Sequence, residues 1–397
     1  MNKAVRPSRR GGILDAMRRE KMARSPHRYV RGSTAGFYAW LNQADRVRIP
    51  EGPAIWICGD CHVGNIGPLC DANGRISIQI RDLDQTVIGN PAHDILRLGL
   101  SLASAARGSN LPGVVTARML ESLMTGYESA FDHAFDEMED LPMPRAVKMA
   151  LKQSRLANWH TLALERLQKR RPTLPLGERY WPLSREEARA VRKLFDDGPI
   201  QALVGSLRHR DSDARVELLD AAYWMKGCSS LGLTRLAILL ELKSKKGGSD
   251  HCIVDVKQAI KAVAPRDCTA KMPRENGKRV LEGARHLAPA LGSRMAATQF
   301  MGKSVFIREL LPQDLKLDIE TLSSGQAEKV ASFLGAVVGR AHTRQMDDGQ
   351  RTRWLADLQR YHVSNLDTPT WLWTGVVDLL ARHERAYLEH CRRYAMQ

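Results

Sequence analysis

The sequence predicts an α+β protein with two lobes, in which a small antiparallel-sheet lobe is inserted after most of a helical large lobe. The chain has 397 residues, more than one compact core usually holds. Apolar residues recur with helical spacing in the first half and again near the C-terminus, which indicates helices at both ends of the chain. Between them, from about residue 216, apolar and β-branched runs bounded by turn residues indicate strands.

The first segment, residues 1–25, is predicted to be a basic arm, flexible or loosely helical. Ten Lys and Arg residues stand against two acidic residues within the first 31 positions, so this stretch carries half of the net charge of +16. Such an arm suits contact with nucleic acid or another acidic surface. It suits a solvated tail equally well, because these positions hold one aromatic residue, Tyr29, and no nucleic-acid-binding motif.

Residues 26–214 are predicted to form most of the large lobe. Short strands are expected at 54–58 and 75–80, with an Asp-Ala-Asn-Gly turn between them. Helical spacing predicts helices over residues 25–41, 91–135 and, with proline breaks, 141–197.

Residues 215–312 are predicted to form the small lobe. Residues 234–242 and 251–259 indicate an antiparallel hairpin around the Gly247-Gly248 turn. The remaining elements expected in this lobe are a helix over 279–291 and a strand over 304–310.

Residues 313–397 are predicted to contain the hinge between the lobes and the helices that complete the large lobe. The first of these helices spans residues 323–342 and has one apolar face.

Bulk properties favour a soluble cytoplasmic protein that does not use a membrane. No apolar run approaches the 18 or so residues that cross a bilayer. The basic N-terminus has no apolar segment behind it of the kind found in secretory signals. Seven scattered cysteines do not form a disulfide framework.

One stretch, ICGDCHVGN at residues 57–65, is compatible with three chemistries. Cys-x-x-Cys-His is the attachment signature of a c-type haem, and Cys-x-x-Cys alone can be a redox dithiol. Haem attachment normally takes place outside the cytoplasm, and a redox pair normally begins a helix, whereas Val-Gly-Asn here favours a loop. The third interpretation is a loop that binds a metal-bound phosphate.

Carboxylates and amides cluster in the strand-loop-strand-loop-helix unit that begins with this stretch. Asp60 and Asn65 leave one loop, and Asp82 and Asp84 follow the next strand. These are the oxygen ligands of Mg²⁺, which takes few protein ligands and shares its remaining positions with phosphates and water. The alternative is an ordinary Asp/Asn-rich surface turn.

The motifs GDCHVGNI and IQIRDLDQTVIGNPAHDILRL resemble those of aminoglycoside-phosphotransferase-like kinases. The resemblance implies that Asp60 is the catalytic base and that Asn65 and Asp82 are Mg²⁺ ligands, with Asp84 as a helper. It places Asp94 on the structural aspartate of the family, because GNPAHD fixes the register. His62 takes an orienting role, and Cys58 stands where these kinases have histidine.

A nucleotide-binding lobe should precede this loop, yet its signals lie downstream. The segment KGCSSLGLTR is typical of a loop that covers phosphates, Lys257 of DVKQA is predicted to reach the phosphates, and Glu282 to pair with Lys257. Glu275 is the competing candidate for this pair, and the alternatives are a solvated lysine at a strand end and a glutamate on a helix surface. FLGAVVGRAHTRQ resembles the helix that leads into the catalytic loop. The elements thus follow kinase order but rotated, which predicts a circularly permuted, protein-kinase-like fold. The residues expected to bind the nucleotide are Gly227, Ser229, Ser230, Gly232, Lys257, Glu282, Glu309 and Leu311.

The chain as a whole also resembles the bacterial domain-of-unknown-function family 2252. The resemblance rests on successive blocks that include KMARSPHRYVRG, GDCHVGNIG, RDLDQTVIGNPAHDILRLGLSL and RAHTR, and it covers about residues 18–345. It implies a kinase-like fold and no particular substrate. Arg31 in the first block is expected either to contact phosphate or to cap a helix or form an ion pair.

These observations predict a phosphotransferase that uses ATP and Mg²⁺ and moves the γ-phosphoryl group to a hydroxyl of an unidentified acceptor. The basic composition suits an acidic or phosphorylated acceptor. Two alternatives remain open: a nucleotidyl (AMP) transferase on the same fold, and a non-catalytic nucleotide-binding or interaction protein that uses its basic arm.

Overall fold

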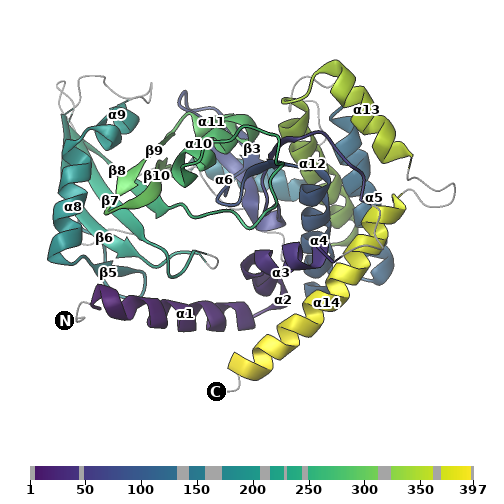
Figure 1. Cartoon of the computed structure of the whole chain (residues 1–397), viewed down its shortest axis with the longest axis horizontal. Helices are drawn as coiled ribbons and strands as arrows, with labels where there is room; N and C mark the ends of the chain where they lie inside the picture. Colours follow the sequence, from purple (N-terminus) through teal and green to yellow (C-terminus); the bar gives the residue numbers. More distant parts are fainter. Residues whose placement is uncertain are drawn as a thin grey trace.

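The computed structural model describes residues 5–43, 49–131, 143–156, 172–205, 215–227, 230–243, 249–311, 323–360 and 368–394. Figure 1 shows a sheet at one side of the molecule and a cluster of helices at the other, with α1 running beneath the sheet toward α2 and α3. The helices before the central sheet are α1 (Pro7–Ala23), α2 (Pro26–Gly32), α3 (Thr34–Leu41), the 3-10 helix η1 (Val63–Asn65), α4 (Ala92–Gly108), α5 (Gly113–Ser129), α6 (Arg145–Leu156), α8 (Arg185–Asp196) and α9 (Pro199–Gly205). The later helices are α10 (Asn276–Leu287), α11 (Pro289–Gly292), α12 (Ser324–Thr343), α13 (Asp348–Gln359) and α14 (Thr370–Tyr394).

The small lobe is built on an antiparallel sheet of six strands, in the spatial order β5-β6-β7-β8-β10-β9. Its strands are β5 (Tyr180–Pro182), β6 (Arg215–Trp224), β7 (Arg235–Lys243), β8 (Ser249–Gln258), β9 (Met295–Phe300) and β10 (Lys303–Leu310). The predicted hairpin is confirmed as β7 and β8, although its Gly247-Gly248 turn lies outside the described residues. Alternate residues such as Leu236 and Val254 form a buried core with α8 and α9, as the period of two in a strand requires.

The large lobe is centred on four helices, α4, α5, α12 and α14. The helices α5 and α12 pack closely because glycines line their contact. A Cβ on Gly126 would lie 1.9 Å from the carbonyl oxygen of Ser332, and one on Gly335 would lie 2.2 Å from that of Leu123. The predicted helix over 91–135 is in fact two helices, because Asn110, with φ of 53°, and Pro112 end one and begin the next.

Two short two-stranded sheets join the lobes. β1 (Ile55–Ile57) pairs with β4 (Val87–Gly89), and β2 (Ile66–Cys70) pairs with β3 (Ile76–Ile80). The strands β1 and β3 were predicted, whereas β2 and β4 were not. The predicted Asp-Ala-Asn-Gly turn therefore connects β2 to β3, and the polar loops on either side of this hairpin carry the candidate site residues.

The segment predicted as a flexible or loosely helical arm is a continuous helix, α1, that packs against both lobes (Figure 1). On the small lobe, Arg10 is buried and forms a two-pronged ion pair with Glu187 of α8, with distances of 2.6 and 3.1 Å. Leu14 is buried in the core beneath the sheet. On the large lobe, the carbonyl of Ala23 accepts a hydrogen bond from the Tyr387 hydroxyl of α14 at 3.0 Å. Contacts with both lobes thus fix this helix, and the charge pattern of the sequence did not predict them.

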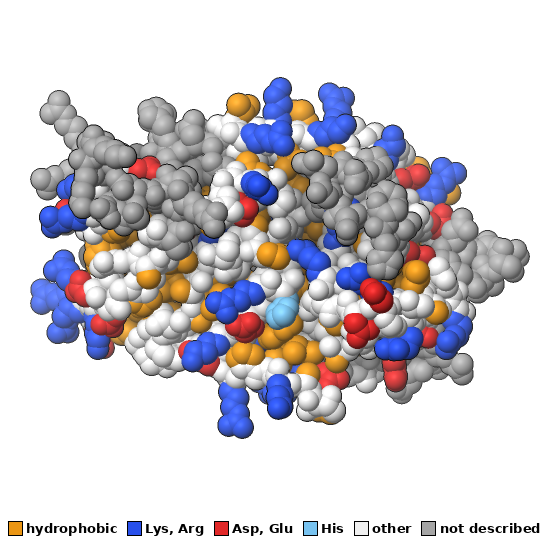
Figure 2. Space-filling view, turned by 90° about the horizontal axis from the view of Figure 1, so that it is seen from above, with side chains coloured by type: hydrophobic (Ala, Val, Ile, Leu, Met, Phe, Trp, Pro, Cys, Tyr) orange, Lys and Arg blue, Asp and Glu red, His pale blue; other side chains and the backbone are white. Residues whose placement is uncertain are grey.

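The surface charge is distributed. Figure 2 shows Lys and Arg side chains around the periphery of the face it presents, with Asp and Glu side chains between them. None of the helices in the described part of the chain is both long enough and apolar enough to cross a membrane.

We expect the buried ion pair of α1 to contribute strongly to stability. Replacing Arg10 with Ala leaves the Glu187 carboxylate buried with only the hydrogen bond from the Ser184 backbone N–H, which should lower the free energy of unfolding by about 3 kcal/mol. Arg9→Ala, on the exposed face of the same helix, is the matched control and should change stability little. Urea unfolding of the two variants measures the difference, and equal unfolding midpoints would contradict the bracing role of α1.

Candidate functional site

The loop that follows β1 is held by the carboxylate of Asp94, in the first turn of α4. Its two oxygens accept hydrogen bonds from the backbone N–H groups of Cys58, at 2.7 Å, and Gly59, at 2.9 Å. Gly59 has φ of +72°, and a Cβ at this position would lie 2.2 Å from the carbonyl oxygen of Gln85. The loop therefore requires glycine at 59 and an acceptor with two oxygens at 94.

A buried chain of polar side chains supports Asp94 from behind. His342 of α12 places Nε2 3.3 Å from Asp94 Oδ2, and the Tyr127 hydroxyl lies 2.9 Å from His342 Nδ1. Trp354 Nε1 donates to the same hydroxyl at 3.0 Å. These distances fit one proton arrangement, in which each group donates to the next toward Asp94. The loop is thus tied to helices α4, α5, α12 and α13.

Asp60 lies at the centre of this loop and is almost fully buried. Arg97, one turn after Asp94 on α4, donates from Nε to Asp60 Oδ1 at 2.9 Å. Burial raises the pKa of Asp60 above its ordinary value, although the Arg97 charge acts in the opposite direction. A carboxylate of raised pKa, oriented by a fixed guanidinium, is suited to accept a proton.

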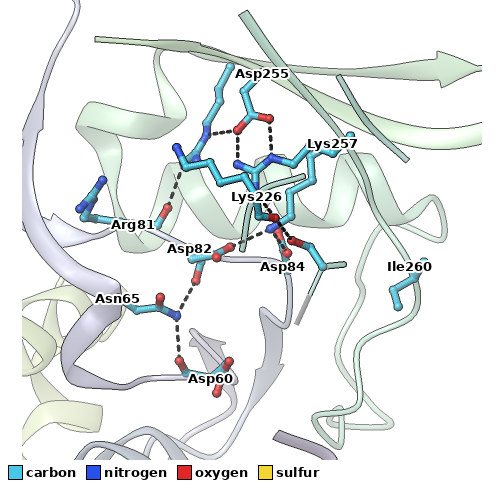
Figure 3. A network of polar contacts seen from close by, with 12 residues as sticks. Asp60, Asn65, Arg81, Asp82, Asp84, Lys226, Asp255, Lys257 and Ile260 are labelled. Atoms are coloured by element: carbon cyan, nitrogen blue, oxygen red, sulfur yellow. Dashed lines mark hydrogen bonds and ion pairs between the residues drawn. The ribbon is translucent and has the colours of Figure 1, made fainter. Parts of the chain in front are cut away.

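Asn65 connects Asp60 to the next motif (Figure 3). Its Nδ2 donates to the carbonyl of Asp60 at 3.0 Å and to that of Asp82 at 3.5 Å. Because both donor contacts face the backbone, Oδ1 is the atom of Asn65 that remains for a cation. The structure therefore brings Asp60, Asn65 and Asp82 together in the order that the sequence motifs predict.

Lys257 reaches this group from β8 of the small lobe. Its Nζ lies 3.3 Å from Asp82 Oδ1 and in direct contact with Asp84 Oδ2. The side chain of Lys257 is 3% exposed and that of Asp82 is 44% exposed, so a ligand could reach the lysine by way of the Asp82 side. Figure 3 shows the three side chains converging between the lobes.

The two aspartates differ in their protonation. Burial favours the neutral form of Asp82, but the charges of Lys257 and Arg308 outweigh burial and hold its pKa well below the ordinary range. Burial and the negative charge of Asp82 raise the pKa of Asp84 to about 6, against the effect of Lys257. Asp82 is therefore the carboxylate that remains ionised throughout the neutral range.

A second cluster positions the lysine strand. Asp255, two residues before Lys257 on the same face of β8, accepts two hydrogen bonds from Arg235 of β7, at 2.9 and 2.6 Å. Arg308 of β10 contacts Asp255 at 3.3 Å and donates to the carbonyl of Arg81 at 3.3 Å. Burial opposes ionisation of Asp255, but Arg235 and Arg308 hold its pKa well below the ordinary range. This cluster joins three strands to the segment that carries Asp82.

The predicted pair between Lys257 and Glu282 is not formed. Glu282 is on α10 but faces outward and pairs with Arg285 at 2.7 Å. The face of α10 turned to the site carries Gly283, packed against Thr86, and the buried Arg279. Arg279 donates to the carbonyls of Asp84 and Ile260, at 3.0 and 2.9 Å, and also to that of Thr86. The helix phase therefore places an arginine, rather than the predicted glutamate, beside the site.

The loop between β6 and β7 lies at the end of the sheet where Lys257 is found. Gly227 and Gly232 have φ of +95° and +98°, which favours glycine at both positions. The buried Ser230 donates to the carbonyl of Lys226 at 3.2 Å. The carbonyl of Thr234 accepts from the backbone N–H of Gln258, next to Lys257. Ser229, the remaining predicted residue of this loop, lies outside the described residues.

The two predicted residues at the end of β10 lie apart from Lys257. Glu309 is buried and pairs with Val254 across the sheet, so its side chain is on the face opposite that of Asp255 and Lys257. Its carbonyl accepts a hydrogen bond from Arg294 at 3.0 Å. Leu311 is buried against Cys70 of β2, where the small lobe meets the β2–β3 hairpin.

The cysteines and the histidine of the loop take interior positions. Cys58 and Cys61 are free thiols with no exposed surface. The pKa of Cys58 is raised by its hydrogen bond with Cys61 and by burial, which is contrary to the activated thiol of a redox pair. His62 is also buried, and burial together with Arg31 and Arg97 lowers its pKa well below the ordinary value, so that it is neutral.

The described residues contain no group of three His, Cys, Asp or Glu side chains arranged to hold a metal. They do offer a smaller oxygen set at Asn65, Asp82 and Asp84. Asp84 Oδ1 is buried and has no hydrogen-bond partner among the described residues. An unpartnered carboxylate oxygen beside an ionised carboxylate and an amide oxygen fits Mg²⁺, whose remaining positions are taken by water and phosphates.

Sequence reasoning missed three arginines that organise this site: Arg97, Arg235 and Arg279. Arg97 gave a signal, because it interrupts an apolar helix three residues after Asp94 and therefore lies on the same helix face. Arg235 is opposite Lys257 in the β7–β8 pairing, which could be found only once the register was known. Arg279 gave no signal that distinguishes it from the other basic residues of α10.

The chain belongs to the family described as "Uncharacterized protein conserved in bacteria (DUF2252)", whose pattern matches residues 13–393. No curated protein matches the chain. No solved structure matches it either.

The glycine at 59 provides a test of the loop geometry. Gly59→Ala should destabilise the protein by roughly 3 kcal/mol, because alanine is strained at positive φ and its Cβ would overlap the Gln85 carbonyl. Gly74→Ala is the control: it has φ of +83° but no atom within 4 Å of the added Cβ, so it should cost about 1 kcal/mol. Thermal unfolding separates the two effects, and equal losses would show that the contact with Gln85 is unimportant.

Proposed function

We propose that the protein is a phosphotransferase that binds ATP with Mg²⁺ between its lobes and moves the γ-phosphoryl group to a hydroxyl. The observation that carries the proposal is the contact of Lys257 with Asp82 and Asp84, which are 175 and 173 positions away in the chain. In kinases a small-lobe lysine contacts the nucleotide phosphates and an aspartate of the other lobe holds Mg²⁺, and the contact of Lys257 with Asp82 brings residues of these two kinds together.

In the proposed reaction, Asp60 orients the acceptor hydroxyl and accepts its proton as the oxygen attacks the γ-phosphorus and the bond to ADP breaks. Arg97 holds the Asp60 carboxylate by its hydrogen bond to Oδ1, so that the carboxylate is oriented to receive the proton. Lys257 contributes a positive charge for the nucleotide phosphates. Catalysis of this kind depends chiefly on positioning and on charge neutralisation.

Mg²⁺ held by Asn65 and Asp82, with Asp84 beside them, would supply positive charge to the phosphate oxygens. The ionised state of Asp82 fits a ligand role, and the raised pKa of Asp84 fits a helper that becomes fully ionised when a cation is near.

The order of small-lobe elements supports the kinase-like part of the proposal. In protein kinases a glycine-rich loop covers the phosphates, the lysine is on the third strand, and a helix follows it. Here the loop joins β6 and β7, Lys257 is on the next strand, β8, and α10 comes after. Because these elements follow Asp60 and Asp82 in the chain rather than preceding them, we propose that the fold is circularly permuted.

Two other functions share parts of this site. A nucleotidyl transferase would use the same lysine and metal ligands with ATP bound in reverse. A non-catalytic nucleotide-binding protein would need Lys257 but no base, and the buried, arginine-oriented Asp60 favours catalysis over this alternative. Binding of nucleic acid through the N-terminus would have to use the exposed residues of α1, since Arg10 is buried.

Substitutions should separate nucleotide binding from chemistry. Lys257→Ala should weaken ATP binding roughly 10-fold to 100-fold, because a charge-assisted contact is lost. Asp82→Asn should remove the part of ATP binding that depends on Mg²⁺. Asp60→Asn should leave binding intact and lower ATP turnover by about 100-fold or more.

Calorimetric titration with ATP and a turnover assay measure these effects. Lys193→Ala, at an exposed position of α8 in the same lobe, is the control and should behave like the unchanged protein. If none of the three site substitutions altered binding or turnover, the proposed function would be wrong.

The products identify the bond that breaks. We expect ADP to accumulate from ATP, with the γ-phosphate transferred or released to water. Chromatography of the nucleotides after incubation with Mg²⁺ shows this directly. Release of pyrophosphate, with AMP attached to the protein or to another acceptor, would instead identify a nucleotidyl transferase.

A further inference from the structure

The short helix α2 lies against the catalytic loop through the arginine that holds Asp60. Arg97 donates from Nη2 to the carbonyl of Val30 at 2.6 Å, and Val30 lies two residues before the end of α2. The next residue is Arg31. A single guanidinium therefore connects the proposed base to α2 and brings the side chain of Arg31 to the same region.

Arg31 and His62 face each other across Gly64. A Cβ built on Gly64 would lie 3.3 Å from Arg31 Nε, 3.3 Å from His62 Nδ1 and 3.2 Å from His62 Cε1. Arg31 Nε of α2 and His62 Nδ1 of the loop after β1 thus both lie close to Gly64, which has no side chain to fill the space.

A buried nitrogen of each of three side chains has no hydrogen-bond partner among the described residues: Arg31 Nε, His62 Nδ1 and Arg97 Nη1. The neutral His62 ring donates from Nδ1 in the tautomer that carries its proton there. His62 and Arg97 are 3% and 1% exposed. Leaving buried polar groups unpaired costs free energy, and the cost is larger for charged groups, so such groups in a native protein require an explanation. The Arg31 and His62 nitrogens share the space beside Gly64, and Arg97 reaches the residue that precedes Arg31, so one oxyanion bound there would give a partner to all three.

We propose that Arg31, His62 and Arg97 bind a phosphate group carried by the acceptor, so that the substrate is a phosphorylated alcohol whose hydroxyl is presented to Asp60. The inference rests on the proposed function for the role of Asp60, but not for the binding of phosphate. Three donors from three elements match the three terminal oxygens of a phosphate monoester, whereas a carboxylate has two.

The location favours the acceptor over the nucleotide as the source of this phosphate. Arg97 contacts Asp60 directly. Lys257, Asp82 and Asp84 lie on the other side of Asn65 from Asp60 (Figure 3). Arg97 orients the Asp60 carboxylate through Nε, and its Nη1 remains available. A phosphate bound to Nη1 would therefore place the acceptor that carries it next to Asp60. The lowered pKa of His62 is consistent with the positive charge of Arg31 and Arg97 nearby.

Inorganic phosphate is the probe that tests this site in the full-length protein. Calorimetric titration should show binding to the unchanged protein, reduced about tenfold in Arg31→Gln, because a charged hydrogen bond is lost. Arg28→Gln, at an exposed position of the same helix, is the matched control and should bind phosphate normally. Gly64→Ala keeps all three donors but places a methyl group between Arg31 and His62, and it should weaken binding as well.

Nucleotides added to the same titration identify the source of the phosphate. ADP and the non-hydrolysable analogue AMP-PNP should bind Arg31→Gln and the unchanged protein equally, and phosphate should bind in the presence of either. Competition between phosphate and AMP-PNP, but not ADP, would overturn the inference by assigning the donors to the γ-phosphate. Equal phosphate binding by Arg31→Gln and Arg28→Gln would also overturn it. Phosphate binding that depends on Arg31 without any affinity for ADP would keep the anion site and reject the proposed function.

Discussion

The contact of Lys257 with Asp82 and Asp84 is the interaction on which the relation between the two lobes depends. A buried lysine is stable only if its charge is compensated. Three cations, Lys257, Arg235 and Arg308, form ion pairs with Asp82, Asp84 and Asp255, and Arg279 lies beside Asp84 as a further positive charge. If a nucleotide bound with Mg²⁺, Lys257 would contact phosphates in place of the carboxylates, and the carboxylates would bind the metal in place of Lys257. Each charge would therefore keep a partner of opposite sign. The pair is therefore suited to hold the lobes together without ligand and to open to one.

The rest of the site depends on a single helix. Asp94 and Arg97 of α4 are three positions apart, so they lie on one face and reach the catalytic loop at two points. Asp94 fixes the backbone of the loop, and Arg97 fixes the Asp60 side chain together with α2. Because the His342 chain supports Asp94 from other helices, a displacement in the helical core would be transmitted to Asp60. The stability of the large lobe and the geometry of the proposed base are thus closely connected.

The sequence motifs named Asp60, Asn65 and Asp82, and the kinase-like order of the downstream elements named Lys257. The structure places these four residues near one another. The prediction for Glu282 was wrong for a physical reason. The site-facing side of α10 is selected by the close contact of Gly283 with Thr86, and this leaves Glu282 on the solvent side. The strand β2 was missed because all five residues of IGPLC are buried, so hydrophobic periodicity gives no signal, and β4 was missed because its three residues are too few to show a period. Only their pairing in the folded structure, β2 with β3 and β4 with β1, identifies these two strands.

The N-terminal segment shows most clearly why net charge is a poor guide to function. Its positive residues were expected to act together as an arm, yet the structure separates them by environment. Arg10 is internal and joins α1 to α8, whereas Arg9 and Arg28 are exposed. Arg31 has a buried nitrogen, Nε, beside Gly64, as His62 does. The cation that contacts Asp60 is Arg97 of α4, and Arg97 in turn contacts α2 through the carbonyl of Val30. The basic N-terminal segment therefore includes residues with internal structural contacts as well as exposed ones, and its net charge alone does not assign it a role.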